Sequence, residues 1–146
     1  MKKIIIYTDG GSRGNPGPAA AGFVFCNEKD QIIKNYSEYL GETTNNEAEY
    51  QAVILALRKF KALFGKKLAK NSEIELKSDS ELLIKQLNGE YKVLEPRIQH
   101  LFIVAWNVKL DFKKVKFKLI SRQRNQAADR LVNEALNSQA QTQKLL

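Results

Sequence analysis

Hydrophobic residues in the first forty positions form short extended runs. Ile4-Ile5-Ile6-Tyr7 is a continuous β-branched and aromatic run, which is typical of a strand buried on both faces. It stops at Asp9-Gly10-Gly11, and a glycine- and proline-rich loop continues to position 18. Two more extended runs, around residues 22–25 and 32–40, are separated by the polar residues 27–30. This pattern predicts a first strand followed by a β-hairpin.

A helical spacing replaces the extended pattern after position 43. Apolar residues recur on one face from Ala48 to Leu63, which predicts a long helix with one buried side. Thr44, with Glu47 three residues later, forms a capping-box pattern at the start of that helix. Gly65 and a basic loop over residues 66–70 are expected to end it.

The second half of the chain alternates strands and helices. Residues 73–77 and 114–119 alternate as strands, the latter with lysines on its outer face. Helices are predicted over residues 82–87, from Pro96 onward, and from about Asn125. The order β-β-β-α-β-α-α-β-α predicts an α/β fold with a five-stranded mixed sheet flanked by helices. We expect one domain over residues 1–138 and a frayed tail over residues 139–146.

Composition narrows the class of protein. The chain of 146 residues suits a single domain, and 24 Lys and Arg against 16 Asp and Glu give a net charge of +8. That excess indicates a polyanionic partner. The single cysteine, Cys26, excludes an internal disulfide and fits a reducing, cytoplasmic setting. No apolar stretch approaches the roughly 20 residues of a membrane span, so no membrane association is expected.

Four acidic residues fall at comparable places in the predicted elements. Asp9 and Asp79 each close a strand, while Glu49 and Asp129 lie near the starts of helices. Ligands of open α/β sheets gather at the carboxyl ends of strands, so the four carboxylates are expected to converge. Such a cluster, without His or Cys, suits Mg²⁺ or Mn²⁺, and two such ions about 4 Å apart could support phosphoryl transfer.

Each acid also has an ordinary explanation when it is taken alone. Asp9 could belong to a turn, and Asp79 could cap a helix. Glu49 and Asp129 could interact favourably with the positive end of a helix dipole. Only their joint placement favours a metal site. The glycines do not match the spacing of a nucleotide-binding motif. His100 lies inside a predicted helix, which favours a surface or packing role over membership of a Ser-His-Asp triad.

Four motifs resemble those of type 1 ribonucleases H. They are Tyr7-Thr8-Asp9-Gly10-Gly11 with Gly14-Asn15-Pro16-Gly17-Pro18, Thr44-Asn45-Asn46-Glu47-Ala48-Glu49, Ser78-Asp79-Ser80, and Asn125-Gln126-Ala127-Ala128-Asp129. The resemblance spans nearly the whole chain and implies the ribonuclease H-like fold. It also implies a monomeric endonuclease that uses two Mg²⁺ ions, with Mn²⁺ as a substitute. The enzyme would cut the RNA strand of RNA–DNA hybrids and leave 3′-hydroxyl and 5′-phosphate ends.

The resemblance also implies a role for each site residue. Asp9 would bridge both ions, Glu49 and Asp79 would hold one of them, and Asp129 the other. Glu49 would also lie near the ribose 2′-hydroxyl. Positions that would contact the hybrid are Asn15, Thr44, Asn45, Asn46 and Ser80. Asn125 could be a further substrate contact or simply a helix cap.

Two features depart from the family pattern. The catalytic-loop histidine of many members is missing, and Arg122 is the candidate replacement, with Arg124 nearby. A guanidinium stays charged near neutral pH, so its role would be electrostatic. A basic handle is also missing between Gly89 and Pro96; the lysines of residues 114–118 and of Lys66-Lys67 could compensate or could be ordinary solvated surface.

Two other functions stay open at this stage. One is a different two-metal nuclease on the same fold, such as a Holliday-junction resolvase or a 3′–5′ exonuclease. The usual D-x-E start of such exonucleases is replaced here by Asp9-Gly10-Gly11. The other is a non-catalytic module that binds hybrids, against which the four retained acids weigh, because an unused carboxylate cluster repels itself.

Overall fold

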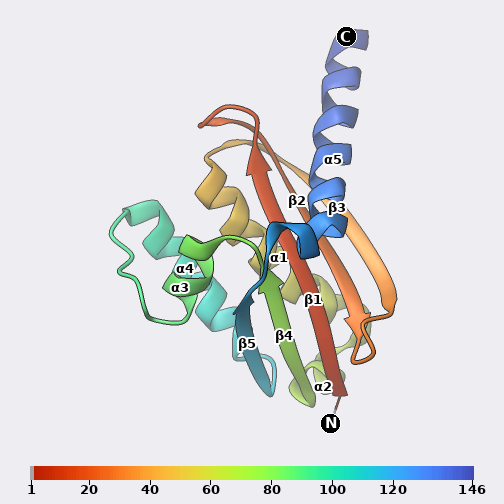
Figure 1. The fold of residues 1–146 in the computed structure, drawn as a ribbon, viewed down its shortest axis with the longest axis vertical. Helices are drawn as coiled ribbons and strands as arrows, with labels where there is room; N and C mark the ends of the chain where they lie inside the picture. The colour runs from red at the N-terminus through yellow and green to blue at the C-terminus, as the bar shows by residue number, and fades with distance from the viewer. Residues whose placement is uncertain (1) are drawn as a thin grey trace.

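The computed structural model describes residues 2–146, built around one five-stranded sheet (Figure 1). The strands are β1 (Lys2–Ser12), β2 (Gly17–Asn27), β3 (Ile32–Thr43), β4 (Ser72–Ser78) and β5 (Lys114–Leu119). Their order across the sheet is β3-β2-β1-β4-β5. The first three strands pair antiparallel, whereas β1, β4 and β5 are parallel. The predicted mixed sheet is therefore confirmed.

Helices cover both faces of this sheet (Figure 1). They are α1 (Asn45–Phe64), α2 (Lys66–Lys70), α3 (Glu81–Leu87), α4 (Pro96–Lys109) and α5 (Gln126–Leu145), and a short 3₁₀ helix, η1 (Arg122–Asn125), precedes α5. The main core lies between the sheet and α1, α3 and α4, and it includes Ile6, Phe25, Leu57, Phe60 and Leu76. A smaller cluster holds Val132 and Leu136 of α5 against Ala20 of β2.

Three boundaries differ from those that the sequence predicts. Residues 66–70 form the helix α2 instead of a loop, because half-buried Leu68 and buried Ala69 give the segment an apolar side. Strand β1 does not stop at Asp9 but stays paired with β2 as far as Ser12 opposite Ala19. The sequence predicts a frayed tail after residue 138, whereas helix α5 continues to Leu145; the last six residues of the chain, 141–146, are exposed (Figure 1).

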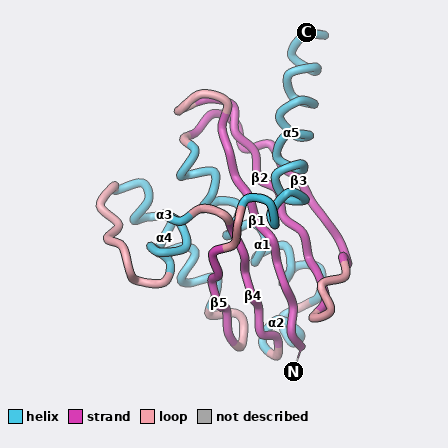
Figure 2. The backbone as a smooth tube through the Cα atoms, viewed as in Figure 1, coloured by secondary structure: helices cyan, strands magenta, loops and turns pink. Residues whose placement is uncertain are grey.

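The connection between α3 and α4, residues 88–95, is a plain loop (Figure 2). No additional helix interrupts it, in agreement with the predicted lack of a basic handle. Across residues 2–146, none of the helices combines the length and the apolar character needed to cross a bilayer.

Candidate active site

The four predicted acids line one cleft of about 380 Å³. Asp9 comes from β1, Glu49 from α1, Asp129 from α5, and Asp79 directly follows β4. Residues of β1, α1, α5, η1 and the adjoining loops complete the walls of the cleft, among them Gly10, Gly11, Ser12, Arg13, Asn45, Ser80, Arg122, Val132, Asn133 and Leu136. Residues that are 120 positions apart in the sequence thus meet at one edge of the sheet.

The parallel pairing of β1 and β4 brings Asp9 and Asp79 together. The last paired residues of these strands are Tyr7 and Lys77. Asp9 and Asp79 each lie two residues beyond that pair, so both emerge at the carboxyl ends of adjacent parallel strands. This is where open α/β sheets hold their ligands.

Two glycines let helices on opposite faces of the sheet approach Asp9. A Cβ atom on Gly10 would lie 2.3 Å from the backbone of Ala48 in α1, and one on Gly22 would lie 2.5 Å from the carbonyl oxygen of Ala128 in α5. Gly10 follows Asp9 in β1, and Gly22 pairs with Asp9 across β2. Because Glu49 follows Ala48 and Asp129 follows Ala128, both close approaches deliver a carboxylate to the cleft.

Crowding of carboxylates changes their acidity. Burial, and then the negative charges of Asp79 and Asp129, raise the pKa of Asp9 to about 8. Burial also raises the pKa of Glu49 to about 7; a hydrogen bond from Ser80 opposes the shift, and the charge of Asp79 adds to it. The cleft therefore disfavours its own negative charge and is suited to a cation.

Neighbouring side chains hold three of the acids by hydrogen bonds. Ser80 Oγ donates to Glu49 Oε2 at 2.6 Å, and Asn45 Nδ2 donates to Glu49 Oε1 at 3.4 Å. Asn125 Nδ2 lies 3.3 Å from Asp79 Oδ1, and Asn133 Nδ2 lies 3.5 Å from Asp129 Oδ2. In this arrangement, no three acidic, His or Cys side chains of residues 2–146 already form a metal-ligand group. The oxygen donors share one cleft, but they are engaged with protein donors.

Of the predicted substrate contacts, Asn45 and Ser80 line the cleft. Asn15 joins them indirectly, because its Oδ1 accepts from the backbone N–H of Asn45 at 2.9 Å. Thr44 begins α1 as predicted, and its hydroxyl accepts from the Glu47 N–H at 3.2 Å. Thr44 and the half-buried Asn46 lie beside the cleft without lining it.

Asn125 occupies the N-cap position of α5, as predicted, but its side chain makes no capping hydrogen bond. The residue is only 1% exposed. Its Nδ2 instead donates to the Thr8 carbonyl oxygen at 2.9 Å and to Asp79. Asn125 therefore ties η1 to the ends of β1 and β4 and positions Asp79.

Arg122 is exposed in η1 and lines the cleft, whereas Arg124 does not. The sequence interpretation missed Arg13 and Asn133, which also line it. Arg13 Nη2 donates to Asn137 Oδ1 of α5 at 2.7 Å. The signal for Asn133 was present, since it lies four residues after Asp129 and so shares its helix face.

The lysines that could compensate for the missing handle lie at two places in the fold. Lys118 pairs with Glu75 at 3.1 Å, and Glu75 also pairs with Lys77 at 3.4 Å, so part of the β5 face is neutralised. Lys66 and Lys67 lie in α2, beside the start of β4 and therefore at the opposite end of that strand from Asp79. Lys66 and Lys67 are therefore not placed to contact a duplex at the acids, whereas Lys118 pairs with Lys77 near the carboxyl ends of the parallel strands.

Comparison with known proteins shows close relatives. A family described as reverse transcriptase-like matches residues 7–135. The chain is 38% identical to ribonuclease HI of Halobacterium salinarum over 92% of its own length and 65% of the relative's. It is 34% identical to a bifunctional protein of Mycobacterium tuberculosis over 96% of its own length but only 37% of that protein. The chain thus spans only part of these relatives.

Solved structures agree with the sequence comparison. LC11-RNase H1, in a crystal structure with an RNA/DNA hybrid, superposes with a TM-score of 0.89 at 46% identity, covering 94% of this chain and 99% of that one. RNase H1 of Halobacterium salinarum gives a TM-score of 0.85 at 38% identity, covering 93% and 98%. On its motifs, its sheet topology and these relatives, the chain belongs to the type 1 ribonuclease H family.

Proposed function

We propose that this chain is an endonuclease that hydrolyses the RNA strand of RNA–DNA hybrids and leaves 3′-hydroxyl and 5′-phosphate ends. The observation that carries the proposal is the convergence of Asp9, Glu49, Asp79 and Asp129, from four separate parts of the chain, in one cleft. Family membership supports the same activity, and LC11-RNase H1 was crystallised with such a hybrid.

The donor set of the cleft fits hard divalent cations. All four acids offer carboxylate oxygens, no His or Cys lines the cleft, and the raised pKa of Asp9 reflects the need for positive charge there. We propose Mg²⁺, with Mn²⁺ as a substitute, held by Asp9, Glu49, Asp79 and Asp129. Glu49 and Asp79, which now accept hydrogen bonds from Ser80 and Asn125, would turn their carboxylate oxygens to the metal when it is bound. Two such ions, once bound, would supply an activated water and stabilise charge on the phosphate.

The other lining residues are suited to place a nucleic-acid backbone. Asn45 and Ser80 present polar side chains to the cleft, and Arg122 lines it with an exposed guanidinium. A guanidinium keeps its charge at neutral pH, so Arg122 would attract phosphate and would not transfer protons. Polar groups beside Glu49 suit contact with the ribose 2′-hydroxyl, the group that distinguishes RNA from DNA.

Two further proposals concern where the enzyme acts and in what oligomeric state. Cys26 is buried and unpaired, which suits a reducing compartment, and we propose that the chain acts in the cytoplasm. The cleft is built entirely from one chain, so we propose that a monomer suffices for catalysis.

A panel of labelled substrates tests the proposal. RNA–DNA, RNA–RNA and DNA–DNA duplexes and a four-way junction are incubated with the protein, with and without Mg²⁺. We expect cleavage of the RNA strand of the hybrid only, and only with the metal. Preferred cleavage of the junction would instead assign a resolvase. Binding of the hybrid without cleavage of any substrate would assign a non-catalytic module.

A further inference from the structure

Seven lysines gather at the end of the sheet where the parallel strands begin. They come from the start of β1, from α2, and from the start of β5 with the residue before it, and all seven are exposed: Lys2, Lys3, Lys66, Lys67, Lys70, Lys113 and Lys114. We call these seven lysines the lysine end. In Figure 1 it lies around the N-terminus and α2, at the opposite end of β1 and β4 from the acidic cleft.

Backbone hydrogen bonds hold these segments side by side. The N–H of Lys2 donates to the carbonyl of Asn71 at 3.1 Å, and the N–H of Lys113 donates to the carbonyl of Ser72 at 3.1 Å. Asn71 directly follows Lys70, so α2 and the starts of β1, β4 and β5 form one rim. The lysine end is therefore a continuous surface.

Helix α2 is built to present its lysines to solvent. Leu68 and Ala69 face inward, and Leu68 lines a hollow together with Lys2 and Lys3 of β1. No acidic residue lies in the helix. Lys66, Lys67 and Lys70 thus project from an anchored element with no acid of α2 to neutralise them.

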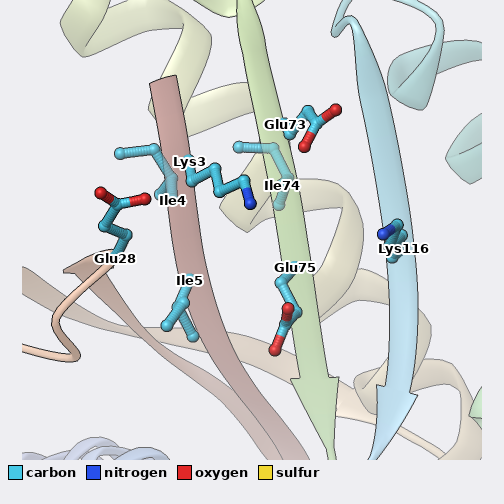
Figure 3. A pocket seen from close by; sticks show the side chains of 8 residues that line it. All are labelled: Lys3, Ile4, Ile5, Glu28, Glu73, Ile74, Glu75 and Lys116. Atoms are coloured by element: carbon cyan, nitrogen blue, oxygen red, sulfur yellow. The ribbon is translucent and has the colours of Figure 1, made fainter. Parts of the chain in front are cut away.

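On the sheet, one acidic residue lies within the lysine end, because Glu73 of β4 is paired across the strands with both Lys3 and Lys114. On the open face of the sheet, Figure 3 shows Glu73 and Glu75 on β4, with Lys3 and Lys116 on the strands to either side and Glu28 beyond β1. That face alternates in charge. At the rim itself, by contrast, none of the seven lysines forms an ion pair with a carboxylate of residues 2–146.

We propose that the lysine end is a second nucleic-acid surface, which binds the phosphate backbone of a duplex segment other than the one at the acidic cleft. From Lys2 to Asp9 the strand rises about 23 Å, at roughly 3.3 Å per residue. Lysines bind phosphates as point charges and read no bases, so this contact is independent of sequence. The choice of nucleic acid over another polyanion rests on the proposed function.

Such a surface changes how the enzyme searches for its substrate. A segment held at the lysine end keeps neighbouring segments at high effective concentration near the cleft. The binding is dominated by counterion release and weakens steeply with salt. The surface would therefore raise affinity for long nucleic acids and leave the chemistry at the cleft unchanged.

The test measures binding of a labelled DNA duplex to the full chain carrying Asp9→Asn, with the cleft saturated by a short unlabelled RNA–DNA hybrid. Lys66→Glu/Lys67→Glu is compared with Lys92→Glu/Lys144→Glu, a pair of exposed lysines outside the lysine end with the same change of charge. Thermal melting verifies that both variants are folded, and Lys66→Gln/Lys67→Gln repeats the test without charge reversal.

We expect the duplex to bind the hybrid-saturated protein. We also expect the α2 variant to weaken this binding by about tenfold and to reduce the salt slope by roughly 2, since each phosphate contact contributes about 0.9. The control pair should change affinity far less. Equal losses of duplex affinity in both pairs of variants would overturn the proposal, and so would binding to anionic vesicles without binding to the duplex. Failure of the hybrid itself to bind, with the duplex still held, would count against the proposed activity and not against the lysine end.

Discussion

Asp9 shares its cleft with three other carboxylates, and this crowding is unfavourable whenever no cation is bound. Its pKa of about 8 lies far above that of an unfolded aspartate, near 4. The metal-free folded protein therefore holds a proton that the unfolded chain gives up. Stability linked to Asp9 is fully present below about pH 4 and is lost as the pH rises toward about 8.

Asp9→Asn removes this pH-dependent loss of stability, and it also removes a metal ligand. In a chelating buffer at pH 7, we expect the variant to be more stable than the wild type by roughly 1–3 kcal/mol, with a flatter dependence on pH between 4 and 8. With Mg²⁺ it should bind hybrids but not cleave them. Calorimetric melting and a cleavage assay check both effects. Glu134→Gln, an exposed acid of α5 outside the cleft, is the control. A stability of Asp9→Asn below that of wild type would contradict the repulsion.

Arg122 and Arg124 provide a matched pair of exposed arginines, only one of which lines the cleft. Arg122→Ala should slow turnover by roughly tenfold, because it removes one electrostatic contact and leaves the four acids in place. Arg124→Ala should leave turnover close to wild type. Single-turnover cleavage rates distinguish the two. A loss in Arg122→Ala as complete as that in Asp9→Asn would make the arginine essential and not auxiliary.

Asn125 is predicted to act through Asp79 and not through the substrate. Asn125→Ala leaves the carbonyl of Thr8 without its buried donor, so we expect a loss of about 1–3 kcal/mol in the free energy of unfolding. It also frees Asp79, which should lower kcat more than it raises KM. Chemical denaturation and steady-state kinetics provide the measurements. A rise in KM with unchanged kcat and stability would restore Asn125 as a substrate contact.

At the scale of elements, Gly10 and Gly22 determine how closely α1 and α5 approach the sheet. Gly10→Ala or Gly22→Ala would place a Cβ inside 3 Å of helix backbone, so a helix must shift. We expect each change to destabilise the protein by about 2–3 kcal/mol and to reduce cleavage by displacing Glu49 or Asp129. Gly11→Ala is the control, since its Cβ would meet nothing closer than 3.6 Å. Equal stability of all three variants would show that the helices are not held by these contacts.

The elements themselves were largely predictable from the sequence. Period-two and helical patterns locate all five strands and four of the helices, because those patterns report which face is buried. Helix α2 escaped prediction because two apolar residues among three lysines are too short a signal. The continuation of β1 past Asp9 escaped because the glycines after Asp9 are typical of a loop, whereas in the structure they pair antiparallel with the start of β2.

The candidate site was predictable to a different degree. The motifs and strand ends indicate the four acids, since each lies at a defined point of an element. The tertiary role of Asn125 was not visible, because its partners, Thr8 and Asp79, are 117 and 46 positions away. The placement of Lys66 and Lys67 at the far end of β4 likewise appears only once the strand order is known.

For the molecule as a whole, α5 divides into a docked part and a projecting part. Val132 and Leu136 are buried, whereas residues 141–146 are exposed (Figure 1). Ending the chain after Ser138 should therefore change stability by no more than about 0.5 kcal/mol and leave hybrid cleavage intact. Melting temperature and specific activity measure this. Ending it after Ser121 should abolish activity, because Asp129 is lost. A large loss of stability in the chain that ends after Ser138 would instead show that the projecting part of α5 stabilises the fold.

The cleft draws its first acid from position 9 and its last from position 129, and this spacing has a consequence for synthesis on the ribosome. A nascent chain that has released the whole sheet still lacks Asp129 and the helix that closes the cleft. If the proposed function holds, the catalytic cleft would therefore be incomplete until α5 has been synthesised and has docked on the sheet.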